Sequence, residues 1–166
     1  TKLVKDTKQI LKKVANSKEV MMVSGQKLKR ISQLDSLTCF QQLLENIQNY
    51  DNFCELMVTA IKPSSALNFD ALRFLFVYNF DTISKSMENS RNSDFVLLKL
   101  QALSRFIGFV YKKYYYVEIK GVLNYILLAL EKGEINVILL VEQIFEKMGG
   151  QVILDNISRS ALYAQS

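Results

Sequence analysis

The chain has 166 residues, of which 49% are hydrophobic and 22% are charged, with one proline and six glycines. This composition is that of a globular domain and excludes a disordered or collagenous chain. A fold of this size removes roughly two-thirds of the unfolded chain's surface from water, enough for one core without disulfide or metal staples. Because histidine is absent, Ser–His or Cys–His catalytic pairs and imidazole metal ligands are excluded.

Positive charge is concentrated at the N-terminal end. Residues 1–31 hold nine Lys and Arg against two acidic residues, a net charge of +7, whereas residues 32–166 carry a net charge of −2. We therefore expect a basic helical segment over residues 1–31 and a helical-repeat scaffold region over residues 32–166. A local positive segment suits nucleic acid phosphates or an acidic protein surface. A solvated helix face is the alternative.

The first third of the chain predicts two helices. Leu3, Ile10 and Leu11 recur at helical spacing and indicate a first amphipathic helix, which Asn16–Ser17 interrupts. We interpret Met21–Met22 as a loosely packed hinge. A second helix follows Asp35 and Ser36, either of which can accept a hydrogen bond from the free amides of its first turn.

The next helices are marked by their ends. Asn52, three residues before Glu55, resembles a capping box for a helix through about Lys62, which Pro63 ends. Asn68 is predicted to cap a helix that carries apolar residues at spacings of three and four. The polar stretch 84–94 is interpreted as a linker or a frayed helix end.

The second half repeats the pattern. Residues 95–113 predict a helix, and we expect 111–117 to form its end and a turn rather than a strand, because a lone strand has no partner for its backbone. A helix from Val122 should end at Gly133 in the left-handed conformation, and another from Val137 should end at Gly149–Gly150. Residues 151–155 are expected to be extended, before a final helix from Ser158.

These segments define an all-α fold of seven or eight helices. Many helices are apolar on more than one face, which favours stacked antiparallel helical hairpins, a HEAT-like or initiation-factor middle-domain-like superhelix, over a four-helix bundle.

The most apolar stretch, 135–141, is far shorter than a membrane helix requires. Cys39 and Cys54 are predicted to be buried thiols in a reducing compartment. The start at Thr1 suggests a piece of a longer chain.

Basic and aromatic residues supply the only candidate contacts. Lysines neutralise phosphates and exposed aromatic rings stack on bases, so clusters of both residue types indicate nucleic-acid binding. The structural alternative to such a binding site is a helix end that carries cations beside half-buried tyrosines. The candidate nucleic-acid or partner contacts are Lys12, Lys13, Lys27, Lys29, Arg30, Lys112, Lys113 and Tyr114. We expect no catalytic, cofactor-binding or metal-binding residue, no enzyme activity and no small-molecule substrate.

Several spaced segments resemble the central helical region of the largest subunit of the THO complex. They are Tyr50–Phe53, Leu67–Leu72, Leu103–Tyr114, Gly121–Tyr125, Leu130–Gly133 and Ile144–Gly150. The resemblance covers about residues 50 to 166.

This resemblance implies a nuclear, non-enzymatic α-helical scaffold. It would belong to the THO/TREX complex, couple transcription elongation to mRNA packaging and export, and dock a DEAD-box RNA helicase. The expected partners are the other THO subunits and the helicase, with a further contact to RNA or mRNP and none to membrane. A nucleic-acid-binding helical-repeat module is the alternative function.

Overall fold

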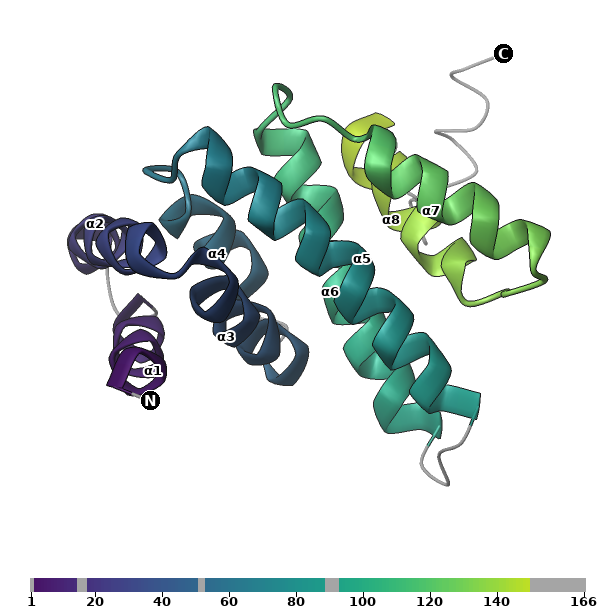
Figure 1. Cartoon of the computed structure of the whole chain (residues 1–166), viewed down its shortest axis with the longest axis horizontal. Coiled ribbons are helices and arrows are strands. Elements are labelled where there is room, and N and C mark those ends of the chain that lie inside the picture. Colours follow the sequence, from purple (N-terminus) through teal and green to yellow (C-terminus); the bar gives the residue numbers. More distant parts are fainter. Residues whose placement is uncertain (1, 15–17, 51–52, 89–92, 150–166) are drawn as a thin grey trace, which may run out of the picture.

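The computed structural model describes residues 2–14, 18–50, 53–88 and 93–149 as helices and the turns between them (Figure 1). The helices are α1 Lys2–Val14, α2 Lys18–Leu34, α3 Ser36–Asn49, α4 Cys54–Ala60, α5 Ala66–Glu88, α6 Ser93–Lys113, α7 Lys120–Glu131 and α8 Val137–Gly149. No strand occurs in these ranges. The predicted all-α fold is confirmed.

The helices are stacked nearly in chain order, from α1 and α2 at one end to α7 and α8 at the other (Figure 1). The longest helices, α5 and α6, pack together across the middle. On one side α3 packs against both of them and α4 packs against α6 and α2, while on the other side α8 packs against α6. Helices in the middle of such a stack have neighbours on two sides, which explains their two apolar faces.

One hydrophobic core runs through the stack. Its centre is formed by large side chains that are almost completely buried, among them Phe40, Leu44, Phe76, Phe80 and Phe106. Burial of each such side chain contributes roughly 1.5–3 kcal/mol. The core also includes Leu11 of α1 and Leu28 of α2, so the basic N-terminal helices are anchored by apolar contacts.

The α6–α8 contact depends on Gly108. A β-carbon at this position would lie 2.7 Å from the main-chain oxygen of Gln143, closer than real side chains approach. Glycine therefore lets the two backbones meet. This contact joins the α7–α8 hairpin to the middle of the stack.

Helix ends follow the sequence in several places. Asp35 Oδ1 accepts a hydrogen bond from the amide of Thr38 at 2.9 Å, as predicted for a cap. The helix α6 ends at Lys113 and a turn follows, so a strand at 111–117 is excluded. Gly133 has a φ of 80° just after α7, the left-handed conformation that glycine adopts without steric cost.

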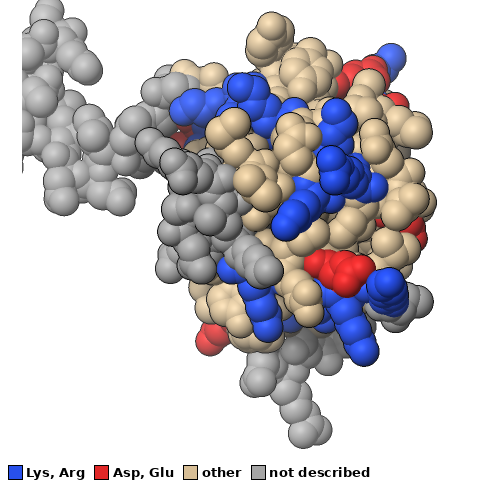
Figure 2. All heavy atoms as spheres, turned by 90° about the vertical axis from the view of Figure 1, so that its left-hand side faces the viewer, with Lys and Arg blue, Asp and Glu red and all other residues tan. Residues whose placement is uncertain are grey.

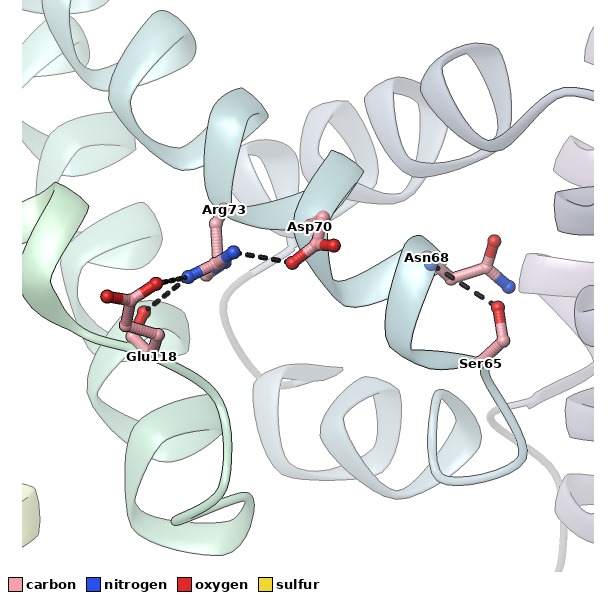
Figure 3. A network of polar contacts seen from close by, with 5 residues as sticks. All are labelled: Ser65, Asn68, Asp70, Arg73 and Glu118. Carbon is pink, nitrogen blue, oxygen red and sulfur yellow. Dashed lines mark hydrogen bonds and ion pairs between the residues drawn. The ribbon is translucent and has the colours of Figure 1, made fainter.

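The predicted cap at Asn68 is wrong. The helix α5 already begins at Ala66, and Ser65 Oγ accepts a hydrogen bond from the Asn68 amide at 3.4 Å (Figure 3). Asn68 itself is buried and its side chain donates to Ser32 Oγ on α2 at 2.8 Å. The asparagine thus bonds to a neighbouring helix, while the preceding serine accepts from the first turn.

The hinge predicted at Met21–Met22 is also wrong, because both residues lie within α2. Over the part of this helix whose side chains are described, residues 22–34, the buried positions are Ser24, Gly25, Leu28 and Ser32. Small and polar residues of this kind give little apolar periodicity, so the sequence indicated a basic helical segment here without the bounds of α2. Of the polar stretch 84–94, residues 84–88 form the end of α5 and residues 93–94 begin α6, while residues 89–92 lie outside the described part of the structure.

Some predictions fall outside the described residues. These are the interruption at Asn16–Ser17, the Asn52 half of the capping box, and the extended segment and helix after Gly150. Where the structure describes the start of α4, the N-cap is Phe53, which makes no side-chain capping hydrogen bond. In the described ranges, no helix combines the length and apolar character needed to cross a membrane.

Candidate nucleic-acid and partner interface

Lysine and arginine side chains are distributed over the α1–α2 end of the molecule, among uncharged residues (Figure 2). In α1, Thr7 and Leu11 are buried, whereas Lys5, Lys8 and Lys12 are exposed. This separation of apolar and charged residues on opposite sides of a helix keeps the ammonium groups in water. The basic segment is therefore an exposed surface.

Tertiary packing divides the candidate cations of this end into two hollows. Lys27 and Arg30 of α2 line a hollow against α1, shared with Asp6 and Gln9. We call this the α1–α2 hollow. Lys12 lies elsewhere.

The second hollow lies between α1 and α3 and is called the α1–α3 hollow. Its lining comprises Lys8, Leu11, Lys12, Gln42, Glu45, Asn46, Asn49, Tyr50 and Phe53. Lys29 belongs to neither hollow and is half-buried. Lys13 falls in the last turn of α1, and its side chain is outside the described part of the structure.

The second predicted cluster, Lys112 to Tyr114, is split by the end of α6. Lys112 is exposed. The Lys113 ammonium donates to Thr59 Oγ1 on α4 at 2.6 Å, which orients it along the α4 surface. Partial burial and the nearby charge of Lys62 lower the Lys113 pKa, against the opposing effect of Glu55.

Tyr114 is not available for stacking on a base. It is buried, its ring lies 5.0 Å from that of Phe69, and its hydroxyl donates to the main-chain oxygen of Val58. Burial raises its pKa. Its neighbour Tyr115 is 89% exposed instead, because the chain turns after α6 and places adjacent side chains on different sides.

Sequence reasoning missed a pair of exposed aromatic residues on α5. Phe74 and Tyr78 are 60% and 54% exposed, and their rings are stacked at 6.1 Å with an interplanar angle of 16°. Together with Leu37 of α3 they line a shallow hollow, and we call these three residues the α3–α5 ridge. Their spacing of four along α5 was a detectable signal, beside the inward row that includes Phe76 and Phe80.

Both cysteines are buried thiols outside any disulfide, as predicted. Burial raises the pKa of the Cys39 thiol to about 12, so it is protonated near neutral pH and unsuited to nucleophilic or metal chemistry. Among the residues described, no three His, Cys, Asp or Glu side chains are arranged to hold a metal ion.

A stack of helical hairpins with exposed basic and aromatic surfaces is typical of proteins that bind other macromolecules along an extended face. A family model described as a transcription- and export-related complex subunit matches residues 28–104. The chain is 28% identical over 160 residues to THO complex subunit 2 of Homo sapiens and of Mus musculus, which covers 96% of this chain and 10% of each relative. It is 24% identical over 163 residues to THO complex subunit 2 of Arabidopsis thaliana, covering 97% of this chain and 9% of that relative.

The chain is thus similar to THO complex subunit 2 over nearly all of its length, in agreement with the resemblance that its sequence indicates. It spans about a tenth of the length of these relatives. The likeness also extends further towards the N-terminus than the segments that first indicated it, since the family model begins at residue 28.

Proposed function

We propose that this chain is a non-enzymatic scaffold segment of the THO/TREX complex in the nucleus. In this role it contacts other THO subunits and docks a DEAD-box RNA helicase, and so takes part in coupling transcription elongation to mRNA packaging and export. The similarity to THO complex subunit 2 supports this role, because that relative is by name a part of the THO complex.

The α3–α5 ridge supports a docking function. Phe74 and Tyr78 point outward from a helix whose opposite side is in the core. Aromatic side chains that protrude at the centre of an interface contribute much of the binding energy of protein pairs. An exposed apolar group flanked by polar residues such as Gln41 and Thr38 is typical of a protein interaction site.

Such a surface can stimulate a helicase without chemistry of its own. A DEAD-box ATPase is active when its two lobes close in one relative orientation. A rigid helical stack that binds the closed helicase more tightly than the open helicase shifts the helicase population toward the closed state. The net charge of −2 over residues 32–166 favours contact with a basic protein lobe over a phosphate surface.

The experiment measures binding and ATPase stimulation of a purified nuclear DEAD-box RNA helicase by the full 166-residue chain. The double variant Phe74→Ala/Tyr78→Ala is expected to weaken association by about 30-fold or more, as for residues at the centre of an interface. A matched control, Tyr115→Ala/Phe145→Ala, also removes one exposed tyrosine and one exposed phenylalanine and should bind as the parent does. Equal binding by both variants and the parent would exclude the ridge as the docking surface.

A further inference from the structure

The α1–α3 hollow combines cations with an exposed aromatic ring. Lys8 and Lys12 form its α1 side, and Tyr50 and Phe53 lie where α3 ends and α4 begins. The α1–α2 hollow contains Lys27 and Arg30 but no aromatic residue. The α1–α3 hollow is therefore the place on the basic end where charge and a ring face the same space.

Its cations are free to bind an anion. Lys5, Lys8 and Lys12 follow one another at spacings of three and four, which places them on one flank of α1 over a length of roughly 10 Å. All three are exposed. Within the described ranges, none of them forms an ion pair with a carboxylate.

The ring of Tyr50 is held in place yet remains accessible. Tyr50 is the C-cap residue of α3, and its amide donates to the main-chain oxygens of Asn46 and Ile47 at 2.9 and 3.2 Å. Its ring meets that of half-buried Phe53 at 6.1 Å and 69°, an edge-to-face contact. The side chain is nevertheless 59% exposed. The contact with Phe53 restricts the ring while much of the side chain stays open to a ligand, which lowers the entropic cost of binding.

We propose that the α1–α3 hollow binds a single strand of RNA. Lys8 and Lys12 contact phosphates, and Tyr50 stacks on an unpaired base. This combination of a positive edge and a stacking ring is how proteins hold single strands, whereas a duplex keeps its bases stacked on each other and out of reach of the ring. The site is distinct from the α3–α5 ridge and does not depend on helicase docking.

The polar lining favours a nucleic acid over an acidic peptide. Glu45 lies in the hollow, where its carboxylate accepts a hydrogen bond from Gln42 Nε2 at 2.9 Å. A carboxylate repels phosphates and acidic side chains alike, but it accepts hydrogen bonds from the amino group of a base, a donor that acidic side chains do not offer. Asn46, on the same wall, supplies an amide that both donates and accepts.

The test measures the anisotropy of a fluorescently labelled single-stranded RNA of mixed sequence, titrated with the full 166-residue chain at several salt concentrations. Tyr50→Ala should weaken binding by about 5- to 150-fold, the effect of losing one stacked base. Tyr50→Phe keeps a ring and should restore most of the affinity. Lys8→Ala/Lys12→Ala should reduce the slope of log affinity against log salt by about 1.4, the release of two counterions from a single strand.

The matched control is Lys27→Ala/Arg30→Ala, which removes the same charge from the α1–α2 hollow. It should weaken binding less than Lys8→Ala/Lys12→Ala does. If both double variants lose affinity equally and Tyr50→Ala binds as the parent, attraction to the basic end is diffuse and the site does not exist. Displacement of the RNA by polyglutamate at equal charge concentration would likewise overturn the proposal in favour of an acidic protein. Circular dichroism at 222 nm establishes that each variant is folded. Because no helicase is present in this titration, the RNA-binding result is independent of the helicase-docking test.

Discussion

Arg73 on α5 donates to both the side chain and the main chain of Glu118, 45 residues later (Figure 3). Its Nη1 lies 2.9 Å from Glu118 Oε2 and 3.1 Å from the Glu118 carbonyl oxygen, while Nη2 pairs with Asp70 at 2.5 Å. These contacts raise the Arg73 pKa, with the hydrogen bond to Glu118 as the largest cause. They fasten the turn between α6 and α7 to α5.

We expect Arg73→Ala to destabilise the fold by about 1 kcal/mol, because the pair is partly exposed and screened by water. The melting temperature should fall by roughly 2–4 °C. Glu118→Gln keeps the main-chain acceptor and should cost less. Thermal unfolding at low and high salt measures both effects. Equal loss for the two variants would show that the main-chain contact contributes nothing.

Tyr114→Phe should destabilise the protein by about 1–3 kcal/mol. The Tyr114 hydroxyl donates to the carbonyl of Val58, which is among the last four of α4 and so has no partner within its own helix. Removal of the hydroxyl leaves this buried acceptor unsatisfied. Urea unfolding checks the prediction, with exposed Tyr115→Phe as a control that should not change stability. An unchanged midpoint for Tyr114→Phe would mean that water replaces the hydroxyl.

Stability should fall as the pH rises from about 9 to 12. Burial raises the pKa of Cys39 from 9.0 to about 12 and that of Tyr111 from 10.0 to about 12. In this window the unfolded chain loses protons that the folded chain retains, so the free energy of unfolding decreases with pH. Below pH 9 the contribution of both groups is complete.

Tyr111→Phe tests the tyrosine part of this decline. Among the described residues the Tyr111 hydroxyl has no hydrogen-bond partner, so its removal should leave stability at pH 7 unchanged or higher. The loss between pH 10 and 12 should become shallower, as measured by urea unfolding at each pH. An identical pH profile for parent and variant would contradict the assignment.

Reversing the charge of Lys12, Lys13, Lys27, Lys29 and Arg30 to Glu should separate two functions. RNA binding is expected to fall more than tenfold at moderate salt, because the variant exchanges attraction of phosphates for repulsion. Helicase association should remain largely intact, since the α3–α5 ridge is unaltered. A titration of both ligands at fixed salt provides the measurement. Joint loss of the two activities would make the basic end the docking surface.

Local sequence determined the helices whose signals are contained within one or two turns. Leu11 opposite a row of lysines specified α1, Asp35 specified the start of α3, and Gly133 specified the end of α7. Such signals depend on periodicity and on free backbone groups at helix ends, which a short stretch of chain already contains. The all-α class followed from their repetition.

Tertiary structure decided what the sequence left open. The helix α2 buries Gly25 because α4 approaches closely, with the Ala60 carbonyl only 2.8 Å from where a Gly25 β-carbon would lie. Packing of α1 against both α2 and α3 placed Lys12 in the same hollow as Tyr50 and Lys27 in a different one. A surface is formed by residues distant in sequence, so its composition depends on how the helices stack and not on the pattern within any one of them.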